Sequence, residues 1–310
     1  MLMHLPVLLS GTIEGLRVVK GGTYVDCTLG GGGHSRAILD RLGPGGRLVG
    51  IDQDPRALEA AKPKLEGTEA RVDLVQGNFR HLGRILAELG IDRVHGILLD
   101  LGVSSFQLDE KERGFSYWED AELDMRMSPA AEVSAYDLVN KASEPEMVRI
   151  IRDYGEERWA SRIAKFIVER RRQQAITSTQ ELVEIIKAAI PAAARRTGPH
   201  PARRTFQAIR IAVNDELGAL ADVLDAALDH LVVGGRMAVI SFHSLEDRLV
   251  KERFARAANP CTCPTDLPVC VCNAKPQVKL ITRKPIVPGE DEIAQNPRSR
   301  SSRLRVVEKI

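Results

Sequence analysis

Four consecutive glycines, Gly30 to Gly33, form the stretch with the clearest potential for ligand chemistry, and His34 follows them directly. Residues 23–28 before the glycines predict a short buried strand, and residues 35–42 after them predict a helix. A glycine loop in this position lets the backbone approach a ligand closely, and the first N–H groups of the helix remain available to hydrogen-bond it. The pattern indicates a ligand site, with a plain tight turn as the competing interpretation.

The loop departs from the two common nucleotide motifs. Either Thr28 or Ser35 occupies a position where the G-x-G-x-x-G dinucleotide fingerprint needs glycine, and no G-K-[ST] follows for a nucleoside triphosphate. Asp52 ends the next predicted strand, 47–52, at about the distance at which an acidic residue meets a ribose hydroxyl pair. A glycine loop with this acid fits adenosine carried without a pyrophosphate, so S-adenosylmethionine is the leading candidate ligand.

Alternating elements must position this loop. Short apolar strands and amphipathic helices alternate as far as residue 100, which is typical of a doubly wound, Rossmann-like α/β sheet. Ligands in such sheets bind at the carboxyl ends of the strands. The residues expected at those ends are Asp26, Asp52, Phe79 and Asp100.

The alternation stops after Asp100 and resumes near residue 205, where a long helix over 205–229 precedes a buried strand at 236–242. Capping boxes and helical periodicity between these points predict an inserted α-helical domain. We therefore expect an α/β core in two parts, 1–108 and 205–310, a substrate-binding helical insertion at 109–204, and a basic tail.

Composition narrows the class of protein. The chain has 310 residues with 44% hydrophobic and 28% charged content, which is typical of a globular protein. We find no apolar run long enough to span a membrane and no signal peptide, and five cysteines in a chain of this length suggest a reducing compartment. We therefore expect a cytoplasmic protein that does not enter a membrane.

Charge is polarised along the helical insertion. Residues 109–157 hold 14 acidic and 6 basic side chains, whereas residues 158–204 hold 3 and 11. The net charge of the whole chain is only +2, so any nucleic-acid surface must be local. The basic residues that crowd one Pro/Gly-bearing loop are Arg195, Arg196, Arg203 and Arg204. They favour a phosphate backbone as partner, with a solvated face as the alternative.

Four cysteines lie close together in the sequence as two C-x-C pairs, Cys261 with Cys263 and Cys270 with Cys272. Their number suits zinc, but the spacing is tighter than in the usual zinc knuckle. Reduced thiols are the other interpretation, and we assign no metal ligand from the sequence.

The chain closely resembles the bacterial family of small-subunit ribosomal RNA cytosine N4-methyltransferases, known as RsmH or MraW, over nearly its whole length. The blocks that carry this resemblance are HLPVL at 4–8, GGGGHS at 30–35, GILLDLGVSS at 96–105, QLD at 107–109, RGFS at 113–116, LDMRM at 123–127, YGEER at 154–158, HPARRTFQA at 200–208, ISFHSLEDR at 240–248 and NPRSRS at 296–301.

The resemblance implies a class I S-adenosylmethionine-dependent fold, a cytosine target in the decoding region of 16S rRNA, and the small ribosomal subunit as partner. Asp52 would hold the ribose of the cofactor and Phe79 would pack on its adenine. Asp100 and Gln107 would surround its methionine end. The full set of cofactor residues that it implies is Gly32, Gly33, His34, Asp52, Phe79, Asp100 and Gln107.

Methylation of an exocyclic amine is chiefly a positioning task, because the nitrogen lone pair is delocalised into the ring. The enzyme must also accept hydrogen bonds as positive charge develops and then accept a proton. Many amino methyltransferases place an Asn/Asp/Ser-Pro-Pro-aromatic motif after the fourth strand, but here that place begins at Asp100 and reads DLGV. Asp100 is the first catalytic candidate and His243, just after a buried strand, is the second.

Two other functions remain open at this point. A DNA amino methyltransferase would share the fold, although we see no target-recognition segment of that kind. A non-enzymatic ribosome assembly factor would not need both the glycine loop and Asp52.

Overall fold

The computed structural model describes residues 6–104, 110–263 and 272–310, and the chain forms two compact units. One unit combines Met1–Gly102 with Leu217–Ile310, and the other is Val103–Glu216. The second boundary falls later than the expected residue 204, because helix α10 (Arg203–Asn214) packs against α6 (Ala135–Lys141) and α7 (Glu144–Asp153) of the inserted unit.

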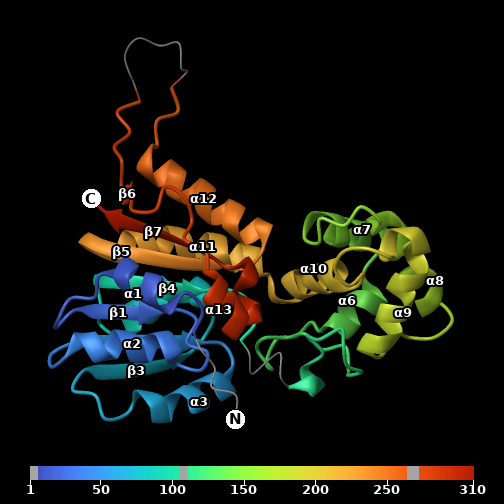
Figure 1. Cartoon of the computed structure of the whole chain (residues 1–310), viewed down its shortest axis with the longest axis horizontal. Helices are drawn as coiled ribbons and strands as arrows, with labels where there is room; N and C mark the ends of the chain where they lie inside the picture. Colours follow the sequence, from blue (N-terminus) through green and yellow to red (C-terminus); the bar gives the residue numbers. More distant parts are fainter. Residues whose placement is uncertain (1–5, 105–109, 264–271) are drawn as a thin grey trace. The chain divides into compact units, whose positions relative to one another are not determined.

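The first unit is built on one seven-stranded sheet with the order β3-β2-β1-β4-β5-β7-β6 (Figure 1). The five strands β1 to β5 are parallel, β7 is antiparallel to β5, and β6 is antiparallel to β7. This confirms the predicted doubly wound sheet. The strands are β1 (Thr23–Asp26), β2 (Arg47–Asp52), β3 (Arg71–Gln76), β4 (Val94–Asp100), β5 (Leu231–Ser241), β6 (Val278–Leu280) and β7 (Arg303–Lys309).

Helices cover both faces of this sheet, and neighbouring residues of β4 show why. Ile97 and Leu99 belong to one apolar cluster, with side chains from α4, α11 and α12, whereas Leu98 belongs to another, with side chains from α1, α2 and α3. Alternate side chains of a strand point to opposite faces, so a continuous apolar run serves two helical layers. The helices of this unit are α1 (Leu9–Leu16), α2 (Gly33–Leu42), α3 (Pro55–Leu65), α4 (Leu82–Glu88), α11 (Glu216–His230), α12 (Ser244–Ala258) and α13 (Glu290–Gln295).

The inserted unit is helical, as the sequence predicts, and has its own apolar core. Met147, Ile163 and Ile186 from three different helices are fully buried in that core. The capping box predicted for α9 is present, with Ser178 accepting from the backbone of Glu181. Besides α6, α7 and α10, the unit contains α8 (Ala160–Arg171) and α9 (Thr179–Ala189).

Residues 205–229 are helical over most of their length, as the sequence predicts, but the stretch is divided into α10 and α11. Asp215 separates them with a φ of 46°, in the left-handed region. Aspartate tolerates this conformation better than most residues other than glycine, so helical periodicity can continue through a break that the apolar pattern does not reveal.

Candidate functional site

The strand order reverses direction between β1 and β4, since β1 leads outward to β2 and β3, while β4 leads to β5. Open α/β sheets bind ligands at such a switch point, outside the carboxyl ends of the strands. Asp26 ends β1 and Asp100 ends β4, so two carboxylates flank the point where a ligand is expected.

The glycine loop follows β1 and leads directly into α2. Gly32 has a φ of 74° and occupies the N-cap position of α2, which therefore has no side-chain cap. Its conformation favours glycine, because a β-carbon is strained at positive φ. Gly33 has a different explanation, since a β-carbon there would collide with Cγ of Pro6. The N-terminus of α2 therefore has no side-chain cap. The close packing of Pro6 requires glycine at position 33.

Asp52, at the end of β2, stabilises this loop by accepting a hydrogen bond from its backbone. Its Oδ2 accepts a hydrogen bond from the backbone N–H of Gly30 at 2.9 Å, and its Oδ1 accepts from that of Asp54 at 2.9 Å. Burial is the main cause that raises the pKa of Asp52 above its usual value. The backbone of Gln53 also donates to Asp52, and a carboxylate offers about four lone-pair directions, so these bonds leave acceptor capacity for a ribose hydroxyl.

Asp26 is the functional candidate that sequence reasoning placed at a strand end but did not select. Its side chain is buried, and it accepts hydrogen bonds from Ser35 Oγ at 2.7 Å and from Thr28 N at 3.1 Å. Burial raises the pKa of Asp26 to about 6. The signal available in the sequence was its position directly before the glycine loop, at the end of a buried strand.

His34 is buried, and both of its ring nitrogens lie near oxygen atoms of the protein. Its Nε2 lies 3.0 Å from the carbonyl oxygen of Val7, so Nε2 must carry the proton and donate it. Its Nδ1 lies 3.5 Å from Oδ2 of Asp100. Burial lowers the pKa of His34 to about 4, so the ring is neutral at neutral pH. His34 therefore hydrogen-bonds the N-terminal segment and lies beside the carboxyl group at the end of β4.

The carboxyl group of Asp100 is the one in this region whose charge is least stabilised by hydrogen bonds. Its Oδ1 is buried and has no hydrogen-bond partner among the described residues, although the side chain as a whole is 25% exposed. Burial first, and then the nearby charges of Asp26 and Glu246, raise the pKa of Asp100 well above its usual value. Two acidic neighbours thus disfavour a charged Asp100, and a cationic ligand would stabilise its charged form.

His243 has a structural position at the start of α12. Its Nδ1 accepts from the backbone N–H of Glu246 at 3.4 Å and caps the helix, while Glu246 accepts from the N–H of Phe242 at 2.8 Å. Its Nε2 lies 3.2 Å from Oε1 of Glu246 without the angle of a hydrogen bond, and has no such partner among the residues that the structure describes. A catalytic role for His243 stays a prediction.

The remaining predicted cofactor residues lie at the edge of this site or beyond the described part of the chain. Phe79 is half-buried and packs against the core at the carboxyl end of β3. Asn78 beside it hydrogen-bonds the side chain of Gln53 at 3.3 Å, which ties the ends of β2 and β3 together. Gln107 and Cys270 lie outside the described residues.

The predicted basic loop belongs to the inserted unit, and Arg195, Arg196 and Arg203 are exposed there. Arg204 is also exposed, but it donates to the carbonyl oxygen of Glu156 at 3.0 Å. The basic side chains are therefore placed to meet solvent or a polyanion, with one of the four already engaged in holding the fold.

Sequence reasoning missed an aromatic cluster in the same unit. The rings of Tyr117 and His200 stack at a centroid distance of 4.8 Å, and Trp118 lies 4.8 Å from His200 at a tilt of 51°. Trp118 is 72% exposed, which is unusual for so large an apolar side chain. The signal was the adjacent pair Tyr117-Trp118 in a chain with only 4% aromatic residues.

Within the described ranges, none of the helices is both long and apolar enough to cross a membrane.

Comparison with known proteins identifies the family. The sequence profile of the MraW methylase family matches residues 1–310. Ribosomal RNA small subunit methyltransferase H of Heliobacterium modesticaldum is 59% identical over 99% of this chain and 98% of that protein. The proteins of the same name from Symbiobacterium thermophilum and Clostridioides difficile are 60% and 53% identical, each over 99% of this chain and over 96% and 99% of their own lengths.

A solved structure, that of an rRNA methylase from Streptococcus thermophilus, is a distant likeness at 10% identity and a TM-score of 0.43, over 99% of both chains. The strand order described above, and not this likeness, establishes the fold. The chain belongs to the MraW methylase family.

Proposed function

We propose that this chain transfers a methyl group from S-adenosylmethionine to the exocyclic N4 amine of a cytosine in the decoding region of 16S rRNA. The names of its relatives support a small-subunit rRNA substrate. The observation that carries the proposal is the acidic switch point, where burial and the nearby charge of Asp26 raise the free-energy cost of a charged Asp100. Such a site favours a ligand that carries positive charge, as the sulfonium and ammonium groups of this cofactor do.

The arrangement at the strand ends suits each part of that cofactor. Asp52 faces the ribose with its spare acceptor capacity, and Phe79 offers an aromatic face to the adenine. Asp26 and Asp100 lie where the methionine end would bring its positive charge. The residues that we assign to cofactor binding are Gly32, Gly33, His34, Asp52, Phe79, Asp100 and Gln107, with Asp26 added by the structure.

The bound cofactor supplies an electrophilic methyl group, and the chain must present the amine to it. Asp100 is our first candidate for this task because Oδ1 lacks a partner among the described residues and could accept a hydrogen bond from the amine. A raised pKa also makes its carboxylate a better proton acceptor than an ordinary aspartate. His243 is the second candidate, although its ring already caps α12.

The inserted unit is the part that we assign to RNA. Exposed arginines on its Pro/Gly-bearing loop can neutralise phosphates, a contribution that does not depend on base sequence. Trp118, resting on the stacked pair of His200 and Tyr117, offers a ring face to an unpaired base. This combination favours single-stranded or distorted RNA, such as the decoding region offers. The proposed ribosomal substrate supports the cytoplasm as the location of the protein.

Methyl transfer to isolated small subunits tests the proposal. Subunits from cells that lack this activity are incubated with isotopically labelled S-adenosylmethionine, and the 16S rRNA is digested for nucleoside analysis. We expect label in N4-methylcytidine from one position of the decoding region. Label in another nucleoside would contradict the assigned target, label in duplex DNA would favour a DNA amino methyltransferase, and binding without label would indicate an assembly factor.

A further inference from the structure

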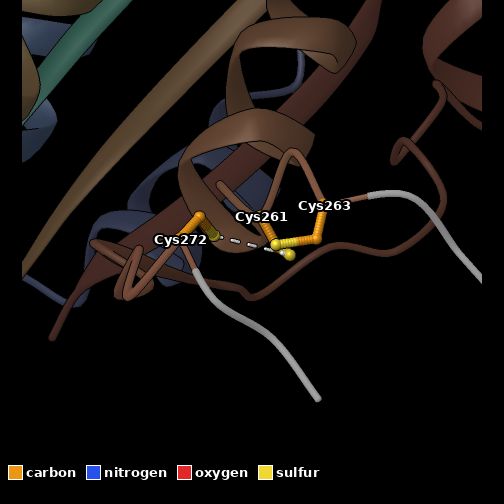
Figure 2. A group of neighbouring side chains, drawn as sticks. All are labelled: Cys261, Cys263 and Cys272. Carbon is orange, nitrogen blue, oxygen red and sulfur yellow. Dashed lines mark hydrogen bonds between the residues drawn. The ribbon is translucent and has the colours of Figure 1, made fainter. Parts of the chain in front are cut away.

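Three cysteine side chains converge beyond the end of α12, on the loop 259–277 that leads to β6. The Sγ atoms of Cys261, Cys263 and Cys272 all lie within 4.8 Å of one another, and those of Cys261 and Cys272 are 3.7 Å apart. Figure 2 shows the three sulfur atoms turned toward one another from the two sides of the loop. Side chains eleven positions apart in sequence therefore meet at one point.

Exposure distinguishes this cluster from an ordinary group of cysteines. Cys261 and Cys272 are exposed and Cys263 is partly exposed, whereas Cys27 is buried in the core of the sheet. Cysteine is among the residue types most often buried, so a gathering of exposed thiols calls for a chemical reason. Thiolates that meet at this spacing are the preferred ligands of soft or borderline metal ions such as Zn²⁺.

Burial does not fix the described parts of this loop. None of its described residues, 259–263 and 272–277, is buried, so no apolar side chain there anchors it to the core. Its base is closed by the N–H of Gln277, which donates to the carbonyl oxygen of Ala257 at 2.8 Å.

We propose that Cys261, Cys263 and Cys272 bind one Zn²⁺ ion, which cross-links the two sides of this loop. Each thiol loses its proton on binding, and a further ligand completes the tetrahedral coordination that zinc prefers. The role is structural. The 15-residue helix α12 begins at the strand ends, and at 1.5 Å per residue its far end lies about 22 Å away from them.

The metal content of the intact chain tests this site. The protein is purified under reducing conditions without a metal-binding tag, incubated with ZnSO₄, desalted and analysed by mass spectrometry for zinc. We expect about one zinc per chain, and replacement by Co²⁺ should give a thiolate-to-cobalt charge-transfer band. Cys261→Ser and Cys272→Ser should each lower retained zinc at least tenfold, whereas Thr262→Ser, an exposed neighbour in the same loop, should retain it.

Calorimetry with S-adenosylmethionine is run on every variant, so that loss of the metal can be separated from loss of the fold. Cys270 is kept unchanged throughout. Wild-type protein that retains no zinc and gives no cobalt band would overturn the proposal, as would serine variants that retain the metal. Recovery of a Cys261–Cys272 disulfide from rapidly quenched cells, without zinc, would also overturn it.

Discussion

The sheet unit and the inserted unit differ in the sign and the exposure of the charged groups that we assign to ligand binding. Two acidic groups at the strand ends of the sheet unit, the buried Asp26 and the partly buried Asp52, accept backbone hydrogen bonds. In the inserted unit, the basic groups of the Pro/Gly-bearing loop, such as Arg195 and Arg196, are exposed to solvent. A small cation is bound best by a few charges fixed in a low-dielectric site, whereas a polyanion is bound by many charges that remain in water.

We expect the largest effect from reversing the charge of exposed arginines in the inserted unit. The change Arg195→Glu, Arg196→Glu and Arg203→Glu should weaken binding to small subunits by about a hundredfold near physiological salt, because it removes and reverses several phosphate contacts. Arg204 is kept, since it holds the carbonyl of Glu156. The measurement is the dissociation constant at several salt concentrations, and its dependence on salt should become shallower.

The matched control reverses three exposed basic residues of the sheet unit, Lys20, Lys62 and Arg84. It changes net charge equally and should leave binding nearly unaltered. Equal loss in both triple variants would show that overall charge, and not the surface of the inserted unit, determines binding. Cofactor affinity should be unchanged in both.

On the acidic side, Asp100→Asn should lower the single-turnover rate at saturating cofactor by about tenfold or more, which corresponds to roughly 1.4 kcal/mol. Asparagine keeps the size of the side chain but removes its charge and its capacity to accept a proton. Asp92→Asn, at the other end of β4 and 94% exposed, is the control and should not alter the rate. Full recovery of the Asp100→Asn rate at saturation would confine Asp100 to cofactor binding and make His243 the next residue to test.

A smaller effect is expected from the aromatic cluster. Trp118→Ala should weaken subunit binding by about tenfold, since stacking of one base on an aromatic ring contributes roughly 1–3 kcal/mol. The salt dependence should stay as in the wild type, because no charge changes. Tyr136→Ala, at an aromatic ring of the same unit that is 38% exposed, is the control. Equal losses in the two variants would argue against a specific stacking role for Trp118.

The sheet unit could be predicted well because its signals are local and repeated. Each strand is a short apolar run followed by a polar residue, so the strand ends at Asp52 and Asp100 were visible before the structure. The positions of the glycines are also evident in the sequence, but the reason why each must be glycine is not. Gly33 makes room for Pro6, which follows only from tertiary packing.

Features that depend on contacts between residues far apart in the chain could not be predicted from the sequence. The stacking of Tyr117 on His200 joins residues far apart in the chain, and no periodicity in the sequence indicates it. The link from His34 to both Val7 and Asp100 is of the same kind. The break at Asp215 was hidden for another reason, because the apolar period continues on both of its sides.

The most direct test of the acidic switch point is the pH dependence of S-adenosylmethionine binding, measured by calorimetry between pH 5 and 8 in buffers of different ionisation enthalpy. Protonated Asp26 carries no charge below its pKa of about 6, so affinity should fall as the pH decreases through that value. His34, with a pKa of about 4, stays neutral over most of this range. Near pH 6 we expect protons to be released on binding, because a cationic ligand lowers the raised pKa values of Asp26 and Asp100. Affinity that is independent of pH, or proton uptake on binding, would contradict a site in which buried carboxylates hold the positive charge of the cofactor.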